Sequence, residues 1–119
     1  MKVINLGLPR TGTTSFKHAL EFLGFGPVDH MTQLMGSPQR WPLWPRFAAG
    51  EDVQLQLFDG FGAGADSPFC CFGPRLFEVY PNAKFVLNVR DASRWHESYI
   101  ENIHPVSYTH LTLPTTPYV

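Results

Sequence analysis

The stretch VINLGLPRTGTTSFKHAL, residues 3–20, decides the fold of this 119-residue chain. It starts with a short apolar run, continues through a loop bounded by Gly7 and Gly12, and ends in an amphipathic segment. The apolar positions of that segment repeat with the spacing of one helix face: Phe16, Ala19, Leu20 and Leu23. Gly24 is a typical helix stop. The stretch therefore predicts a buried strand, a tight loop and a helix, in that order.

The loop from Gly7 to Gly12 predicts a site for an anion. In such a loop, consecutive backbone N–H groups and the dipole of the following helix converge on a phosphate. The glycine spacing is that of the pattern GxxxxGK[ST], but Thr13 stands where that pattern has its lysine. The lysine is a main cation for a Mg²⁺-bound triphosphate. Because the loop carries Arg10 as its cation instead, the sequence favours a single phosphate or phosphosulfate group.

A second apolar strand, KFVLNV, is predicted at residues 84–89, directly before Arg90. Asp91 is expected to cap a helix whose apolar stripe is Trp95, Tyr99 and Ile103. The weaker elements are extended segments at 25–29 and 63–66, a helical turn at 30–35, helices at 51–58 and 72–80, and a packed proline-rich connector at 37–47. Strands that alternate with helices predict an α/β domain with a parallel sheet.

Two arginines follow the carboxyl ends of the two clearest strands. Arg10 comes after the first strand and Arg90 after the second. Ligands of open parallel sheets bind outside the carboxyl ends of the strands. Two separated cations on that rim suit a ligand with two anionic groups.

The motifs resemble those of sulfotransferases that use 3′-phosphoadenosine 5′-phosphosulfate (PAPS). GLPRTGTTSF is similar to the family's 5′-phosphosulfate loop, and FVLNVRDASRWHESY carries the family's second signature, Arg90 followed by Ser98. ADSP and YPNAKFVLNVRD look like landmarks of the small sulfotransferase-like P-loop proteins. The resemblance covers residues 3–105. It implies a P-loop NTPase-like three-layer α/β/α fold with a central parallel sheet, truncated at the C-terminus because the relatives are longer.

The resemblance also implies which residues hold the co-substrate. The first loop would bind the 5′-phosphosulfate, and Arg90 with Ser98 would hold the 3′-phosphate. The implied binding residues are Arg10, Thr11, Gly12, Thr13, Thr14, Ser15, Arg90 and Ser98. No metal is implied, because the sulfuryl group carries one negative charge and the loop lacks the Lys-Ser/Thr pair. The acceptor would be a small molecule with a hydroxyl or amine.

Three residues are expected to carry the chemistry. The resemblance implies that Arg10 assists departure of the phosphate leaving group, and a base would take the acceptor's proton. Asp66 in ADSP is the first choice for the base, although an aspartate with an ordinary pKa of about 3.9 needs burial to act near neutrality. His30 is the alternative base. A turn-forming Asp66 before Pro68 and a structural His30 stay open.

Composition excludes several other classes. The formal net charge of −1 argues against a general nucleic-acid binder, and no apolar run has the ~20 residues of a membrane span. The cysteines, Cys70 and Cys71, are adjacent, which indicates reduced thiols in a cytoplasmic protein. Enzyme activity, oligomeric state and acceptor stay open. The alternatives are a non-catalytic phosphoadenosine phosphate-binding module, an inactive fragment and, with less support, an ATPase.

The final segment, PVSYTHLTLPTTPYV, departs from the pattern of the rest. It has no charged residue, four threonines and three prolines. We expect residues 1–105 to form the domain and residues 106–119 to be a foreign or disordered tail. An ordinary exposed terminus is the alternative.

Overall fold

Four parallel strands form one sheet in the computed structural model, which describes residues 1–102. The strands are β1 (Val3–Asn5), β2 (Val28–Asp29), β3 (Ala63–Gly64) and β4 (Lys84–Val86), and their order in the sheet is β2-β3-β1-β4. Every pairing is parallel. This confirms the predicted α/β class and its central parallel sheet.

The strand register brings the carboxyl ends together. Val3 of β1 lies opposite Ala63 of β3 on one side and Lys84 of β4 on the other. Ala63 in turn lies opposite Val28 of β2. The segments after β1, β2 and β3 therefore leave the sheet at one edge, and these are the segments that carry Arg10, His30 and Asp66.

Short helices connect the strands. The described helices are α1 (Thr13–Phe22), α2 (Met31–Met35), α3 (Leu43–Ala48), α4 (Gln54–Leu57), α5 (Gly73–Val79) and α6 (Ala92–Asn102), with 3₁₀ turns η1 (Pro38–Arg40) and η2 (Phe69–Cys71). The predicted connector at 37–47 is thus resolved into η1 and α3. The helix expected at 51–58 is only one turn. The strands are shorter than expected: β3 and β4 end two and three residues early, and β2 begins three residues late.

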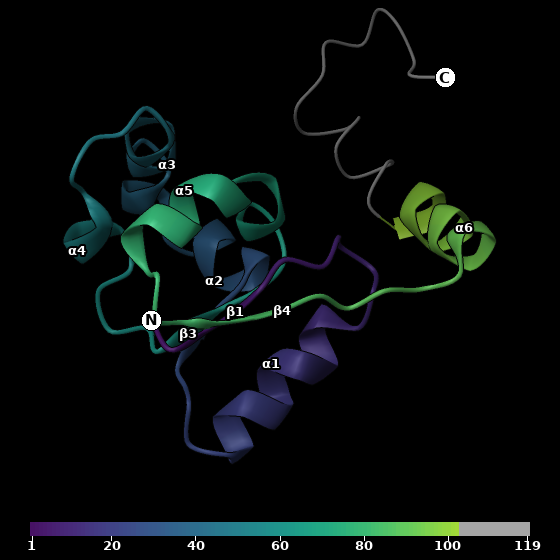
Figure 1. Cartoon of the computed structure of the whole chain (residues 1–119). Coiled ribbons are helices and arrows are strands. Elements are labelled where there is room, and N and C mark those ends of the chain that lie inside the picture. Colours follow the sequence, from purple (N-terminus) through teal and green to yellow (C-terminus); the bar gives the residue numbers. More distant parts are fainter. Residues whose placement is uncertain (103–119) are drawn as a thin grey trace, which may run out of the picture. The chain divides into compact units, whose positions relative to one another are not determined.

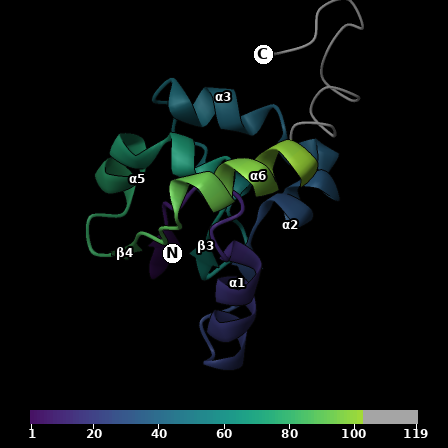
Figure 2. The same ribbon diagram turned by 90° about the vertical axis from the view of Figure 1, so that its right-hand side faces the viewer.

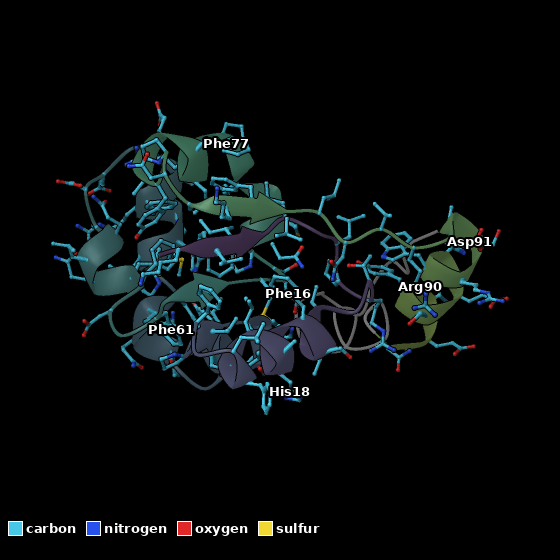
Figure 3. All side chains as sticks on the ribbon, turned by 60° about the horizontal axis from the view of Figure 1, so that its bottom comes forward. Phe16, His18, Phe61, Phe77, Arg90 and Asp91 are labelled. Carbon is cyan, nitrogen blue, oxygen red and sulfur yellow. The ribbon has the colours of Figure 1, made fainter. Side chains whose placement is uncertain are left out.

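Helices cover both faces of the sheet. Val3 packs with Leu20 of α1, whereas its neighbour Ile4 packs with Phe47 of α3 and Leu76 of α5. Successive strand residues point to opposite faces, so this alternation separates two apolar layers. Figures 1 and 2 show α1 on one side of the strands and α3 with α5 on the other. Phe16 points from α1 toward the sheet, while His18 points away (Figure 3). The three layers follow from this arrangement.

An aromatic cluster fills the layer on the side of α3. Trp44 is 4% exposed, and its ring packs edge-on against the rings of Phe47, Phe58 and Phe69 and stacks on Phe72. Such edge-to-face pairs stabilise a core beyond the area they bury. Trp44 is therefore a core residue.

The chain divides into two compact units, residues 1–88 and the segment from Val89 onward. In the second unit, the N–H of Arg94 donates to Asp91 Oδ2 at 3.1 Å, which confirms the expected helix cap of α6. Trp95 and Tyr99 stack at 5.3 Å, as the predicted stripe requires. Ile103 and the expected tail at 106–119 lie outside the described residues.

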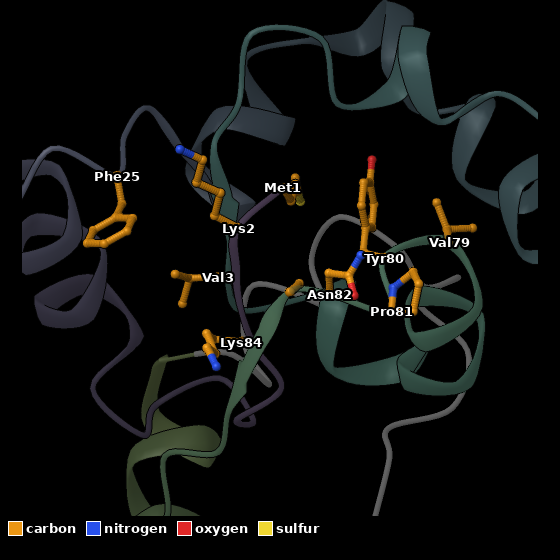
Figure 4. A pocket seen from close by; sticks show the side chains of 10 residues that line it. Met1, Lys2, Val3, Phe25, Val79, Tyr80, Pro81, Asn82 and Lys84 are labelled. Carbon is orange, nitrogen blue, oxygen red and sulfur yellow. The ribbon is translucent and has the colours of Figure 1, made fainter.

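A hollow of about 560 Å³ opens at the amino-terminal ends of β1 and β4 (Figure 4). Lys2, Lys84 and Tyr80 line it together with apolar side chains. It lies at the sheet edge opposite to the segments that follow β1, β2 and β3. None of the residues predicted to bind or react lines it, so the hollow is not part of the candidate site.

Candidate functional site

The loop after β1 turns directly into the N-terminus of α1. Gly12 caps the helix with φ of 94°, in the left-handed region that favours glycine, and its carbonyl accepts the first helical bond from Phe16 N–H at 3.0 Å. Arg10 also has a positive φ, 66°, and its side chain is exposed. The loop thus presents a cation and the first N–H groups of a ten-residue helix, which is the arrangement that binds an anion.

The buried side-chain amide of Asn5 contacts this loop. Asn5, at the end of β1, is fully buried, and its Oδ1 accepts a hydrogen bond from Gly7 N–H at 2.7 Å. Its Nδ2 is buried with no hydrogen-bond partner in the described part of the chain. A buried donor without a partner costs stability, so Asn5 Nδ2 is an unsatisfied polar group next to the loop.

We expect Gly7→Ala to damage the loop. A Cβ at Gly7 would lie 2.9 Å from the carbonyl oxygen of Asn88 and 3.0 Å from both Asn5 Oδ1 and Thr11 Oγ1. Overpacking of this kind costs about 1–3 kcal/mol, and any relaxation would move the backbone N–H groups of the loop that we expect to bind an anion. The expected result is a lower melting temperature and weaker binding of phosphate, measured by calorimetry.

The control for Gly7→Ala is Gly36→Ala. The Cβ added there meets its nearest neighbour, the carbonyl oxygen of Gln33, at 3.7 Å, which is ordinary contact. Equal losses of anion affinity in the two variants would contradict a special packing role for Gly7.

The two candidate bases form one pair. His30 follows β2 and Asp66 follows β3, so neighbouring strands bring them together. His30 Nε2 lies 3.3 Å from Asp66 Oδ2, and the two residues are 5% and 7% exposed. Asp66 Oδ1 is buried with no hydrogen-bond partner among residues 1–102. The sequence offered the two residues as alternatives, and the structure places them side by side.

Thr13 joins this pair from the first turn of α1. Its Oγ1 lies 3.1 Å from His30 Nε2, and the residue is buried. On the other side of the ring, His30 Nδ1 accepts the N–H of Thr32 at 3.3 Å, so that His30 caps α2. The imidazole is therefore fixed at both nitrogens, between α1 and Asp66.

Burial dominates the protonation of the pair. It raises the pKa of Asp66, and the opposing effects of His30, the Ser67 and Met31 amides and Arg10 do not cancel it. Burial also lowers the pKa of His30, although Asp66 raises it. Both directions favour the neutral forms. An aspartate whose pKa is raised in this way has the property required of a base near neutrality.

A buried ion pair beneath the site escaped the sequence analysis. Arg40 donates from Nη1 to Asp29 Oδ2 at 2.8 Å and from Nη2 to Asp29 Oδ1 at 3.0 Å. Nη1 also donates to the Leu57 carbonyl at 3.0 Å, and the guanidinium lies over the Phe61 ring. Asp29 directly precedes His30. An acidic residue at the end of a buried strand predicts a partner, but no local pattern indicates Arg40.

The other predicted binding residues have separate positions. Thr11 Oγ1 donates to the Leu8 carbonyl at 2.6 Å, while Thr14 and Ser15 are exposed in the first turn of α1. Arg90 is exposed four residues after the end of β4, and Ser98 is buried on α6; both belong to the second unit. Cys70 and Cys71 are free thiols, and burial raises the pKa of Cys70 to about 11.

Comparison with known proteins gives the family. The profile of the sulfotransferase domain matches residues 2–118. The chain belongs to the sulfotransferase domain family. A curated relative, Ava biosynthesis cluster protein M of Aspergillus versicolor, is 34% identical over 108 residues, which cover 82% of this chain. The chain spans 41% of the length of that relative.

Membership of the sulfotransferase domain family agrees with the fold. A parallel sheet flanked by helices, with a glycine-bounded loop after its first strand, is the P-loop sulfotransferase architecture expected from the sequence. Across residues 1–102, none of the helices has the length and apolar character needed to cross a bilayer.

Proposed function

We propose that this sulfotransferase-domain protein binds PAPS and transfers its sulfuryl group to a hydroxyl or amine of a small-molecule acceptor. One observation carries the proposal: the buried pair of His30 and Asp66 is joined through Thr13 to the helix that follows the glycine-bounded loop. The proposed base therefore lies close to the loop that we propose holds the phosphosulfate group. Family membership supports the same reaction class.

The residues around the loop fit the 5′-phosphosulfate. The absence of a side chain at Gly7 lets the loop backbone pack closely against Asn5, Thr11 and Asn88. Helix α1 begins directly after Gly12, and the buried Asn5 Nδ2 has no hydrogen-bond partner among residues 1–102. Arg10 supplies positive charge. The 3′-phosphate is assigned to Arg90 and Ser98 on the resemblance of their motif.

Each of these groups has a definite task. PAPS supplies the sulfuryl group and a phosphate leaving group. Asp66 accepts the proton of the acceptor nucleophile, and His30 keeps the carboxylate oriented through Nε2. Arg10 and the N-terminus of α1 stabilise the negative charge that grows on the leaving oxygen, which is the dominant contribution in reactions of this type.

Substitution of Arg10 tests the co-substrate site. Arg10→Gln keeps a long polar side chain and removes the charge. Loss of a charge-assisted contact worth about 1.5–3 kcal/mol corresponds to about 10–100-fold weaker binding of 3′-phosphoadenosine 5′-phosphate. Calorimetry would measure it, with Arg10→Lys expected to recover part of the affinity.

Arg46→Gln is the matched control for Arg10→Gln, because Arg46 is an exposed arginine on α3 that pairs with Glu51. It should bind as the wild type does. No binding by the wild-type protein, or no loss in Arg10→Gln, would contradict the proposed function.

A second function is nucleotide binding without transfer. It needs only the anion loop and the motif of Arg90 and Ser98, and not the proposed base Asp66. Binding without turnover over a broad panel of acceptors would support it. The relative's name refers to a biosynthesis cluster, so small metabolites are the first acceptors to test. A cytoplasmic location is part of the proposal.

A further inference from the structure

One nitrogen of His30 faces two oxygens. Nε2 lies 3.1 Å from Thr13 Oγ1 and 3.3 Å from Asp66 Oδ2. These oxygens come from different parts of the proposed machinery. Thr13 is the first residue of the helix after the glycine-bounded loop, whereas Asp66 is the proposed base. His30 therefore stands between the anion loop and the group that takes the acceptor's proton.

The hydrogen bonds of the ring assign its proton. Nδ1 lies 3.3 Å from both the backbone nitrogen and the hydroxyl oxygen of Thr32. A backbone N–H can only donate, so we take Nδ1 as its acceptor, without a hydrogen of its own in the neutral imidazole. The single ring proton is then on Nε2. One proton cannot be donated at full strength to two oxygens, so Thr13 and Asp66 compete for it. The hydroxyl hydrogen of Thr13 is left to be donated elsewhere.

We propose that Thr13 is a positioning residue that makes the basicity of Asp66 depend on occupancy of the anion loop. This inference rests on the proposed function, because it requires an anion at the N-terminus of α1. When the Thr13 hydroxyl donates to that anion, its oxygen becomes a stronger acceptor, since consecutive hydrogen bonds polarise one another. The Nε2 proton then shifts toward Thr13, and Asp66 loses the hydrogen bond that stabilised its charged form.

The consequence is that Asp66 becomes a stronger base once the co-substrate is bound. No covalent bond changes at Thr13 or His30. In the transfer step, the acceptor's proton goes to Asp66 and the acceptor oxygen or nitrogen bonds to sulfur as the phosphate oxygen leaves. Thr13 therefore links binding of the co-substrate to abstraction of the acceptor's proton, without contacting the acceptor itself.

We call the hydrogen-bonded path from Thr13 through His30 to Asp66 the relay. Charged groups on every neighbouring element act on it. Asp66 from the loop after β3 and Asp29 at the end of β2 raise the pKa of His30, while Lys17 and His18 of α1 lower it. Arg10 of the anion loop lowers the pKa of Asp66. A bound anion also acts on His30 directly through its charge. The test must therefore separate the hydroxyl relay from the charge effect.

Two variants of Thr13 make that separation. Thr13→Val keeps the shape of the side chain and removes the hydroxyl, and Thr13→Ser keeps the hydroxyl. The ¹⁵Nε2 resonance of His30 is followed while 3′-phosphoadenosine 5′-phosphate is added. In the wild type and in Thr13→Ser we expect the ligand to shift this resonance. Thr13→Val loses the hydrogen bond to the anion, so it should bind the nucleotide more weakly; at saturating nucleotide, where the ligand charge is the same, we expect most of the shift to be lost.

The outcomes distinguish the relay from the proposed function. If the wild type binds nucleotide and its Nε2 resonance does not move, the relay is overturned while the proposed function stands, even if Thr13→Val does not fold. An undiminished shift in Thr13→Val also overturns it. If the wild type binds no nucleotide, the proposed function fails and the relay fails with it. A supporting result is a larger loss in kcat than in nucleotide affinity for Thr13→Val.

Discussion

Asp66→Asn should reduce sulfuryl transfer by about 10²–10⁴-fold, the usual contribution of a positioned base, and leave nucleotide affinity close to that of the wild type. Asparagine has the same shape as aspartate and tolerates the left-handed backbone found at Asp66, where φ is 70°. Its amide oxygen can still accept the proton of His30 Nε2. The substitution therefore removes the basic carboxylate and little else. Steady-state kinetics and calorimetry on the same samples would separate the two effects.

The pH dependence of the wild type gives a second measure of Asp66. Transfer by the proposed mechanism requires the ionised carboxylate, so the rate should rise as pH passes the Asp66 pKa, which burial raises above its ordinary value. The residual rate of Asp66→Asn should not show this rise with pH. Asp59→Asn, at an exposed aspartate after α4, is the control and should keep it. A wild-type rate that does not vary in the acid range would argue against Asp66 as the base.

Stability should change in the opposite direction to activity. The pKa of Asp66 is higher in the folded protein than in the unfolded chain. Asp66 therefore stabilises the fold fully at pH values below its unfolded-state pKa, and this stabilisation is lost as the pH rises through its folded-state pKa. Asp66→Asn avoids this loss, so near neutral pH the variant should unfold at a temperature no lower than the wild type. A protein that keeps such a residue sacrifices stability for function.

The sequence predicted the parts of this site that depend on local pattern. The loop after β1 follows from glycine spacing, whereas Asp66 is expected from the family resemblance and His30 from the general use of histidine as a base. The contact between them depends on the order β2-β3-β1-β4, which periodicity does not specify. The inward hydroxyl of Thr13 likewise depends on how α1 lies against β2. These features arise from tertiary packing, where local propensity carries no information.

The ion pair of Asp29 and Arg40 is the largest feature that the sequence analysis missed. The two residues are eleven positions apart, in different elements, and their side chains are 1% and 9% exposed. The pair joins the end of β2 to η1 and, through the Leu57 carbonyl, to α4. Since Asp29 directly precedes His30, the pair also fixes the backbone from which the proposed relay begins.

Asp29→Ala should therefore lower the free energy of unfolding by about 3–5 kcal/mol, the cost of leaving a buried charge without its partner. That is a large part of the about 5–15 kcal/mol that stabilises an ordinary domain, and urea denaturation would measure it. Glu51→Ala is the matched control, because its pair with Arg46 is about half exposed on both sides and exposed pairs contribute at most about 1 kcal/mol. Equal losses in the two variants would contradict the buried role of Asp29. The double variant Asp29→Leu/Arg40→Met leaves no unpaired charge, so it should recover much of the loss, which would show that the cost lies in the orphaned guanidinium rather than in the missing attraction.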